Sequence, residues 1–255
     1  MQKSVILKYS LIGFAATMLA TQAYADKTKW ETLKSGLQYT TIPLQENNKT
    51  GKLHAFKINL KQYQLHLTTA NSINRNAATA EALGESQKAL VAINGGFFSP
   101  DRQLLGLRVN NGDIINPVRP ISWWSIFYVK NNKAYIAKPQ YYQHSNSVTF
   151  AVQAGPRLVI NGYIPSLKPG IDERSALCIN RNGQVIIAAT ENTPVSTNTL
   201  AKVLDKSENQ GGLGCYNALN LDGGSSTQLY AKVNNFTLNV PNFNQVTDAI
   251  VVTEK

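Results

Sequence analysis

The residues of this chain that could carry chemistry lie where two apolar runs end in glycine pairs. The first run ends in Asn94-Gly95-Gly96, and the second ends in Asp222-Gly223-Gly224-Ser225-Ser226. Glycine lets the backbone turn sharply, and successive N–H groups that are exposed in this way form a concavity that binds anions. A plain tight turn explains either glycine pair alone. An acid followed by two glycines and two hydroxyls, directly after an apolar run, favours a site around Asp222.

Two further stretches place an arginine beside a predicted strand. Arg157 follows the break Gly155-Pro156, and Arg174 closes the charged run Asp172-Glu173-Arg174 before another apolar segment. Arginine can bind a phosphate with two parallel hydrogen bonds. Taken alone, residues 172–174 are more typical of a solvated charged cluster at the end of a strand.

Strands are the main elements that must position these residues. Alternating or short apolar runs between turn signals predict them. We expect strands at residues 37–42, 53–60, 64–69, 89–93, 105–109, 114–116, 125–129, 134–137, 175–179, 184–190, 216–221, 228–233 and 249–253. Residues 53–60 and 64–69 are expected to be a strand pair, and Asn- or Gly-containing turns predict hairpins around residues 110–113, 131–132 and 182–183.

Helices are predicted at two places. Residues 77–90 are rich in helix-forming side chains and lack proline, and residues 197–207 begin with Ser196 or Thr197 as the N-cap. No repeat, low-complexity tract or linker divides the chain. We therefore expect a single α+β domain, with a mainly antiparallel or mixed β-sheet and a few flanking helices. Within it, residues 26–84 are the N-terminal arm and strands, and residues 85–255 are the core of the domain.

The N-terminus carries the pattern of a secretory signal. Lys3 and Lys8 precede an apolar run, and Ala23-Tyr24-Ala25 has small residues where a signal peptidase cuts. Residues 1–25 are therefore expected to be a signal peptide that is cleaved after Ala25. The apolar run is too short to span a bilayer comfortably, which disfavours a membrane anchor. We expect an exported protein, periplasmic or secreted, with no transmembrane segment after cleavage.

The charge balance is basic. The formal net charge is +10, and removal of the two leader lysines leaves +8. A positive surface attracts anionic polymers such as phosphate-rich polysaccharides. The basic residues are scattered, without a Lys/Arg block or a basic helix with interleaved aromatics, so no nucleic-acid partner is expected.

The two cysteines, Cys178 and Cys215, favour a disulfide, because an exported protein meets an oxidising compartment. Two buried free thiols are the alternative. Neither cysteine has a Cys or His at ligand spacing, so the pair is not expected to bind a metal. The histidines at positions 54, 66 and 144 are isolated and are interpreted as structural.

Four motifs, taken in order, resemble the phosphodiester glycosidase family. They are Ala92-Ile93-Asn94-Gly95-Gly96-Phe97-Phe98, Gln153-Ala154-Gly155-Pro156, Arg174-Ser175-Ala176 and Leu221-Asp222-Gly223-Gly224-Ser225-Ser226. The resemblance covers roughly residues 85–253. The family includes N-acetylglucosamine-1-phosphodiester alpha-N-acetylglucosaminidase and bacterial exported proteins that are often related to exopolysaccharide. Ser225 stands where many relatives carry a third glycine, a departure that affects loop detail more than chemistry.

The resemblance implies hydrolysis of a sugar-1-phosphodiester, such as one in an envelope or extracellular glycan, to free sugar and a phosphomonoester. Cleavage at an anomeric carbon passes through an oxocarbenium-like state that a carboxylate stabilises. Asp222 is the expected carboxylate, as nucleophile, base or metal ligand, and Glu173 is its expected acid or base partner. Glu191 is a reserve. No cofactor is expected to be required, and a divalent metal near Asp222 remains open.

The departing phosphate needs its charge neutralised. The residues expected to do this are Arg174, Arg157, Gly223, Gly224, Ser225 and Ser226. Asn94 is expected to hold sugar hydroxyls or the phosphate, and Gly95 and Gly96 to let the substrate approach. Phe97 and Phe98 fit either a sugar face or the core. The hypothesis requires that Asp222 share one basic hollow with Asn94, Arg157 and Arg174.

Two other functions remain open. A non-catalytic module could bind phosphorylated polysaccharide during exopolysaccharide or envelope assembly, whereas paired carboxylates in one cleft would favour the enzyme. A serine hydrolase using Ser225 or Ser226 is disfavoured, because the chain has no Gly-x-Ser-x-Gly elbow and no histidine in a suggestive context.

Overall fold

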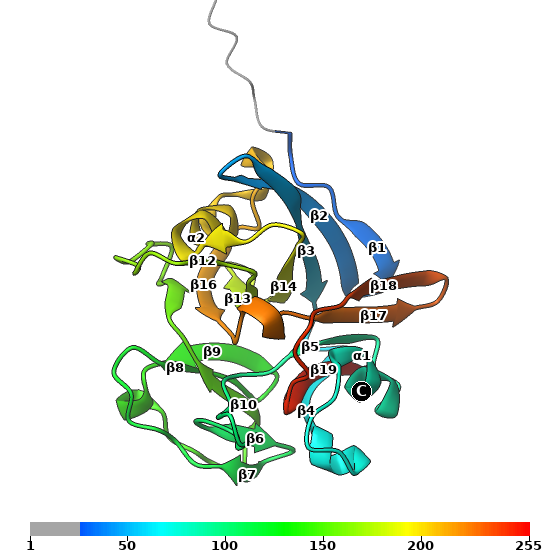
Figure 1. Ribbon diagram of the computed structural model, residues 1–255, viewed down its shortest axis with the longest axis vertical. Helices are drawn as coiled ribbons and strands as arrows, with labels where there is room; N and C mark the ends of the chain where they lie inside the picture. The colour runs from blue at the N-terminus through cyan, green and yellow to red at the C-terminus, as the bar shows by residue number, and fades with distance from the viewer. Residues whose placement is uncertain (1–25) are drawn as a thin grey trace, which may run out of the picture.

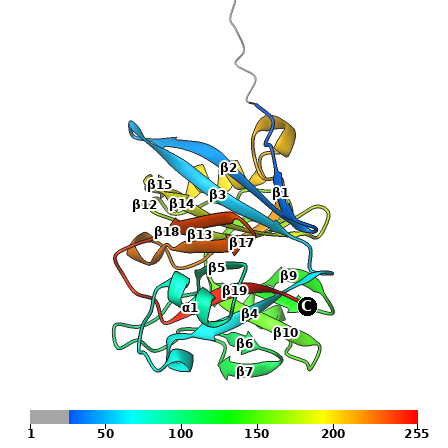
Figure 2. The ribbon, with the colours of Figure 1, turned by 90° about the vertical axis from the view of Figure 1, so that its right-hand side faces the viewer.

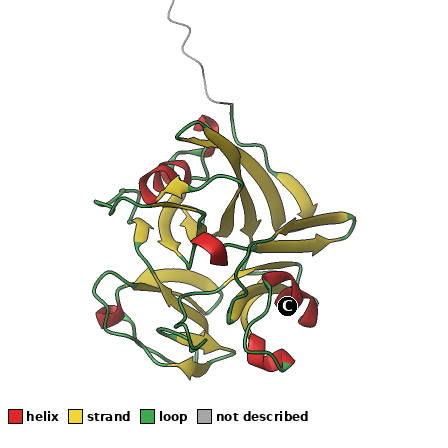
Figure 3. Ribbon diagram, viewed as in Figure 1, coloured by secondary structure: helices red, strands yellow, loops and turns green. Residues whose placement is uncertain are grey.

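The computed structural model describes residues 26–255, and the expected signal peptide lies outside them. Strands dominate this part of the chain, which also contains two α-helices, α1 (Ala80–Ser86) and α2 (Thr197–Asp205) (Figure 3). All strand pairings among the described residues are antiparallel. The expected α+β class therefore fits in outline, with antiparallel rather than mixed sheets.

Three larger sheets build the molecule (Figure 1). The seven-stranded sheet has the order β1 (Glu31–Lys34), β2 (Leu37–Glu46), β3 (Lys49–Ile58), β14 (Val185–Glu191), β13 (Ser175–Asn180), β16 (Cys215–Asn220) and β11 (Arg157–Val159). One five-stranded sheet has the order β18 (Phe236–Val240), β17 (Leu229–Val233), β5 (Val91–Asn94), β19 (Asp248–Glu254) and β4 (Tyr63–Thr69). The other has the order β7 (Asp113–Asn116), β6 (Arg108–Asn110), β10 (Val148–Ala154), β8 (Ser125–Lys130) and β9 (Lys133–Ala137). A small ribbon pairs β12 (Ile171–Asp172) with β15 (Val195–Ser196).

The three sheets share one hydrophobic core. Phe56 of β3, Ile93 of β5 and Phe150 of β10 belong to the same buried cluster, although they come from three different sheets. Strands buried on both faces read as apolar runs, which is why β13 and β14 are apolar almost throughout. Figure 2 shows the sheets stacked, with β5, β13 and β17 near the middle of the molecule. Site residues at those strand ends are therefore held by the core on several sides.

Each helix covers one sheet. Leu200 and Leu204 of α2 pack on the seven-stranded sheet, and Leu83 of α1 packs on the sheet that contains β5. Ser196, one of the two N-caps that the sequence predicted, caps α2 by accepting a hydrogen bond from the Thr199 amide at 3.0 Å. Helix α1 is shorter than the predicted residues 77–90, because it begins after Thr79 and ends at Ser86.

The predicted strand pair of residues 53–60 and 64–69 is wrong. Both segments are strands, but β3 pairs with β2 and β14, whereas β4 pairs with β19 in another sheet. Asn59 turns the chain between them, since its carbonyl accepts from the Tyr63 amide at 3.1 Å and its side chain accepts from the Lys61 amide at 3.0 Å. Alternation predicts strands but not which neighbour each strand pairs with.

The three predicted hairpins are confirmed. They are β6–β7, β8–β9 and β13–β14. Asn111, Asn131 and Asn132 have positive φ at two of the turns, which is the conformation that asparagine tolerates better than other non-glycine residues.

The expected disulfide is present. Cys178 of β13 and Cys215 of β16 are joined, with a Cα–Cα distance of 5.7 Å, and so link two neighbouring strands of the seven-stranded sheet. Within residues 26–255, no helix has the length and apolar character needed to cross a bilayer.

Candidate functional site

The ends of β5 and β16 meet, as the two glycine motifs suggested. Asn94 donates from Nδ2 to the Asp222 carbonyl at 2.8 Å, and its Oδ1 accepts from the Ser175 hydroxyl at 2.6 Å and from the Gln228 amide at 3.2 Å. The Asn94 side chain is fully buried. Its donors and acceptors are thus occupied by protein, and it positions Asp222 instead of holding substrate as expected.

Asp222 lies just beyond the end of β16 and is partly exposed. Its Oδ1 accepts from the Gly223 amide at 3.0 Å. Burial is the largest influence on this carboxyl and raises its pKa, while the Ser226 hydroxyl and the Gly223 amide favour the ionised form. Ser226 is buried beside it, so this serine supports Asp222 from within the protein.

Glu173 lies on the neighbouring segment. Its backbone carbonyl accepts from the Gly224 amide at 2.7 Å, which continues the pairing of β13 and β16 beyond their ends. Burial raises the pKa of the Glu173 carboxyl, and Asn242, which donates to Oε2 at 2.6 Å, opposes that shift. Two carboxyls with raised pKa values thus come from adjacent strand ends.

The Gly223-Gly224 pair is needed because the Asp172-Glu173 segment approaches it closely. A Cβ on Gly223 would lie 2.8 Å from the Glu173 carbonyl oxygen, and a Cβ on Gly224, whose φ is +60°, would lie 2.9 Å from the Asp172 carboxylate. Both glycine amides donate to protein acceptors, namely the Asp222 carboxylate and the Glu173 carbonyl. The expected anion-binding use of these two amides is therefore not available in this structure.

A cavity of about 590 Å³ opens beside Glu173. It is lined by Asp172, Glu173, Asn192, Pro194, Gly224, Ser225, Pro241, Asn242 and Phe243. The exposed Ser225 faces this cavity, but Ser226 does not line it. Two carboxylates and no lysine or arginine line this hollow, so it is not the basic hollow that the sequence predicted.

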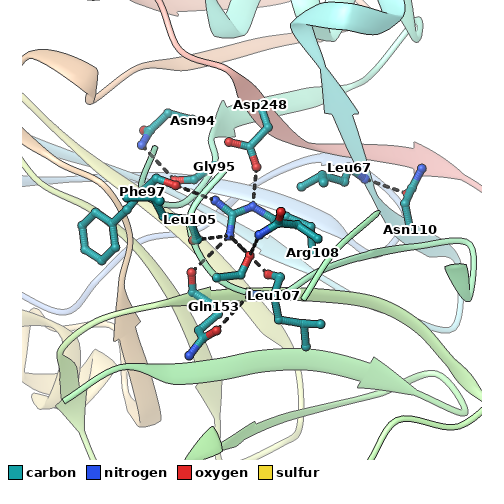
Figure 4. A network of polar contacts seen from close by, with 12 residues as sticks. Leu67, Asn94, Gly95, Phe97, Leu105, Leu107, Arg108, Asn110, Gln153 and Asp248 are labelled. Carbon is teal, nitrogen blue, oxygen red and sulfur yellow. Dashed lines mark hydrogen bonds and ion pairs between the residues drawn. The ribbon is translucent and has the colours of Figure 1, made fainter. Parts of the chain in front are cut away.

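The first glycine pair makes room for a buried ion pair. A Cβ on Gly95 would lie 2.4 Å from the Asp248 carboxyl, and a Cβ on Gly96 would lie 2.6 Å from Nη2 of Arg108. Arg108 donates from Nε to Asp248 at 2.6 Å, and both side chains are fully buried. The two glycines, which were predicted to admit substrate, therefore pack closely against Arg108 and Asp248. Figure 4 shows Gly95 beside this ion pair.

Arg108 ties several segments together around this pair. It donates from Nη2 to the Phe97 carbonyl at 3.2 Å and from Nη1 to the Gln153 carbonyl at 3.3 Å (Figure 4). The Gln153 side chain in turn accepts from the Leu107 and Arg119 amides, both at 2.9 Å. Sequence reasoning missed this network, because nothing marks Arg108 and Asp248 as partners 140 residues apart.

Arg174 lies beside the site but turns away from Glu173. It donates from Nη2 to the Gly170 carbonyl at 2.6 Å and from Nε to the Val195 carbonyl at 3.2 Å, and burial lowers its pKa. It lines a second cavity of about 790 Å³. That cavity is lined by Ser122, Trp123, Pro156, Ser166, Leu167, Lys168, Pro169, Gly170, Ile171, Asp172, Arg174 and Thr197.

Arg157 does not belong to the site. It donates from Nη2 to Oδ1 of Asn217 at 2.5 Å, and burial lowers its pKa. Asn217 lies four residues before Leu221, which immediately precedes Asp222, and four residues span about 13 Å along an extended strand. Arg157 therefore points along β16 away from Asp222, and the expectation that it neutralises the phosphate is not supported.

The remaining candidates are divided between the core and other contacts. Phe97 packs on Trp124 with ring centroids 5.0 Å apart, and Phe98 lies under Arg102. Glu191, the reserve carboxylate, accepts from Nε2 of the buried His54 at 3.0 Å. Among residues 26–255, no group of three or more His, Cys, Asp or Glu side chains is arranged to hold a metal ion, so the surroundings of Asp222 do not supply a ligand set of that kind.

Comparison with sequence families gives a match over most of the chain. A family model described as phosphodiester glycosidase matches residues 87–253. The uncharacterized protein YigE of Escherichia coli (strain K12) is 29% identical over 116 residues, which is 40% of this chain and 44% of that protein. This chain therefore matches less than half the length of that curated relative.

Solved structures share the fold at low sequence identity. A hypothetical protein from Synechocystis has a TM-score of 0.63 and 18% identity, with 91% of this chain and 65% of the other covered. The catalytic domain of zebrafish N-acetylglucosamine-1-phosphodiester alpha-N-acetylglucosaminidase, auto-inhibited by its pro-peptide, has a TM-score of 0.66 and 16% identity, with 90% and 88% covered. A Burkholderia pseudomallei K96243 protein described as exported has a TM-score of 0.55 and 11% identity, with 80% and 74% covered.

Proposed function

The chain belongs to the phosphodiester glycosidase family, and we propose that it is an exported hydrolase that cleaves a sugar-1-phosphodiester to free sugar and a phosphomonoester. One observation carries this proposal. The carboxyls of Asp222 and Glu173 lie on two adjacent backbone segments, joined by the 2.7 Å hydrogen bond from the Gly224 amide to the Glu173 carbonyl. Glycoside cleavage through an oxocarbenium-like state uses two carboxyls, and two adjacent segments that each carry one are suited to supply them.

The two carboxyls take different parts in the proposed reaction. The bond between the anomeric carbon and the bridging oxygen breaks, and the phosphate leaves with that oxygen. A water oxygen becomes the new anomeric hydroxyl, and its proton passes to a base. Asp222 stabilises the positive charge at the anomeric carbon. Glu173 is the base, since burial brings its pKa nearer to neutrality and Asn242 holds the carboxylate in place.

The phosphate is assigned to the side of Arg174. Its guanidinium and the exposed Lys168 line the second cavity, next to the Asp172-Glu173 segment. Cations beside a departing phosphate neutralise charge that develops in the transition state. Sequence reasoning proposed Arg174 for this task and missed Lys168. The proposal requires no resident cofactor.

Hydrolysis of a defined substrate tests the proposal. Residues 26–255 would be purified and incubated with methyl phosphodiesters of several sugar 1-phosphates, including N-acetylglucosamine 1-phosphate. Release of free sugar is expected from at least one of them. Asp222→Asn and Glu173→Gln should each lose about a hundred-fold or more in kcat, which is the usual range for a group that acts in the transition state. Ser225→Ala is the matched control, because this serine is exposed in the same cavity and has no assigned part in the chemistry.

The outcomes separate the candidate functions. If the wild-type protein releases no sugar from any member of the panel but binds the phosphodiesters, the non-catalytic binding module replaces the hydrolase. If Ser225→Ala abolishes turnover while Asp222→Asn does not, a serine hydrolase replaces both.

Export is part of the proposal. The Cys178–Cys215 disulfide supports it, because such bonds form and persist in oxidising compartments, and so does the exported Burkholderia relative. N-terminal sequencing of the protein recovered from outside the cytoplasm should begin at Asp26. Recovery of the uncleaved chain from the cytoplasm alone would contradict both export and the cleavage after Ala25.

A further inference from the structure

Two cavities adjoin the segment Asp172-Glu173-Arg174. Asp172 lines both of them, whereas Glu173 lines only the cavity of about 590 Å³ and Arg174 only that of about 790 Å³. The segment that carries the proposed base therefore adjoins two hollows, each of a size that holds a ligand as large as a small drug.

Each cavity carries one exposed aromatic ring. Phe243 is 99% exposed at the edge of the Glu173 cavity, and Trp123 is 55% exposed at the edge of the Arg174 cavity. Exposed apolar groups that line a hollow mark a binding surface more often than isolated ones do. An aromatic face offers a flat apolar surface on which the C–H face of a sugar ring packs, while the sugar hydroxyls stay in water.

The Trp123 ring is held in place from behind. Its centroid is 6.0 Å from that of Phe97 and 5.7 Å from that of Trp124, which is buried. A Cβ on Gly155 would lie 2.8 Å from the Trp123 carbonyl oxygen, so a glycine is needed for this loop to pack where it does. A ring fixed before binding loses little entropy when a ligand packs on it.

Phe243 is placed by its backbone instead. Its amide donates to Oδ1 of Asn242 at 2.8 Å, and Asn242 also donates to the Glu173 carboxylate. The next residue, Asn244, donates from its amide to the Ser225 carbonyl at 3.1 Å, and Arg102 donates to the Gln245 carbonyl at 2.5 Å. The loop that presents Phe243 is thus anchored to the proposed base and to the wall of its cavity.

The two cavities differ in the charges that line them. Lys168, Arg174 and Asp172 line the Trp123 cavity and give it two positive charges and one negative charge, whereas the Phe243 cavity is lined by Asp172 and Glu173 without a lysine or arginine. A phosphodiester anion is attracted to the first and repelled by the second. The phosphate and the group esterified to its far side therefore lie on the Trp123 side. The sugar that is released, with any unit attached before it, lies on the Phe243 side.

From this geometry, and on the basis of the function proposed above, we propose that the substrate is a polymer of sugars joined by phosphodiesters and that the enzyme cuts it internally. Phe243 packs on the sugar that precedes the cleaved unit, and Trp123 packs on the sugar on the far side of the phosphate. Each internal cut leaves one fragment with a free reducing end and another with a phosphomonoester. An enzyme that removed only a terminal sugar would need no exposed platform beyond that sugar.

A pair of pentamers tests the mode of cleavage. Both consist of N-acetylglucosamine 1-phosphate units joined through C6, and one of them carries a bulky ether on the terminal C6 hydroxyl. Wild-type protein is expected to cut both at similar initial rates, with dimers and trimers as first products by mass spectrometry. Cleavage of the uncapped pentamer alone, with monosaccharide as the first product, would overturn the inference while leaving the proposed function intact.

Aromatic variants test the two platforms. Trp123→Ala and Phe243→Ala should each raise KM for the capped pentamer by about ten-fold, which corresponds to loss of one aromatic contact, and should leave kcat/KM for the methyl phosphodiester of N-acetylglucosamine 1-phosphate unchanged. Tyr141→Ala is the control, since this ring is 73% exposed and lines neither cavity. Equal losses on both substrates would overturn the two platforms. Failure of wild type to cleave either substrate would overturn the proposed function as well.

Discussion

The contact between Asn242 and Glu173 allows the proposed base to be tested through its pH dependence. Asn242 donates from Nδ2 to Oε2 of Glu173 at 2.6 Å, and the carboxylate is partly exposed. A hydrogen bond to an ionised group contributes about 1.5–3 kcal/mol when it is buried, and solvent reduces this to about 1 kcal/mol at a partly exposed position. Loss of the donor then changes the ionisation equilibrium of Glu173 by about five-fold.

The sign depends on the role of the carboxylate. Burial already raises the pKa of Glu173, and Asn242 opposes that shift. Asn242→Ala should therefore raise this pKa further, so that the base becomes protonated at a higher pH. The acid limb of the pH profile of kcat/KM should move to higher pH, where the proton concentration is about five-fold lower, while the alkaline limb stays in place.

The assay is hydrolysis of a sugar-1-phosphate methyl phosphodiester between pH 4 and pH 9. NMR titration of the Glu173 carboxyl carbon measures the same equilibrium without substrate. Asn239→Ala is the control, because Asn239 is exposed on β18 and does not line the cavity of Glu173. An acid limb that stays in place in Asn242→Ala, with only a uniform loss of rate, would refute the assignment of Glu173 as the base.

Three further predictions concern stability. Burial raises the pKa of Asp222 above its ordinary value of 3.8, so the protonated carboxyl stabilises the protein and this stabilisation is lost as pH rises. Asp222→Asn should therefore raise Tm at pH 7 by about 2–4 °C. Calorimetry should find no gain at pH 3. Gly95→Ala should cost about 3 kcal/mol or more in urea unfolding, because its Cβ would lie 2.4 Å from the Asp248 carboxyl, and an unchanged midpoint would contradict the packing described. Replacement of both Cys178 and Cys215 by alanine should lower the free energy of unfolding by about 3–4 kcal/mol, because the disulfide joins residues 37 apart in sequence. Reduction of the disulfide in the wild-type protein should lower the free energy of unfolding by the same amount.

The sequence predicted where the site lies better than it predicted what each residue does. Apolar runs that end in Asn94 and Asp222 indicated strands that deliver side chains to one place, and a 2.8 Å hydrogen bond joins these two residues. This hydrogen bond occupies the Asn94 side chain, however, so the side chain does not face a ligand. A strand-end motif indicates convergence, but orientation depends on neighbours that are distant in sequence.

The glycines show the same division. The sequence correctly predicted turns after β5 and β16, but it assigned Gly95 to substrate approach because it could not place Asp248 nearby. Arg157 was misplaced for a related reason. Its strand, β11, is only three residues long, and its register on β16 directs the guanidinium to Asn217. Register between distant strands has no local sequence signal, whereas hairpin turns such as residues 110–113 do.

The position of β19 has a consequence for when the site can first exist. This strand supplies Asp248 and lies between β4 and β5, so it must insert between two strands made much earlier. Contacts of such long sequence separation form late and slowly. Before that insertion Arg108 lacks its carboxylate partner, and Gly95 lacks the Asp248 side chain against which it packs. A chain that had not yet placed β19 would therefore lack the Arg108–Asp248 pair, and the site proposed above would be complete only after the sequence through β19 had folded.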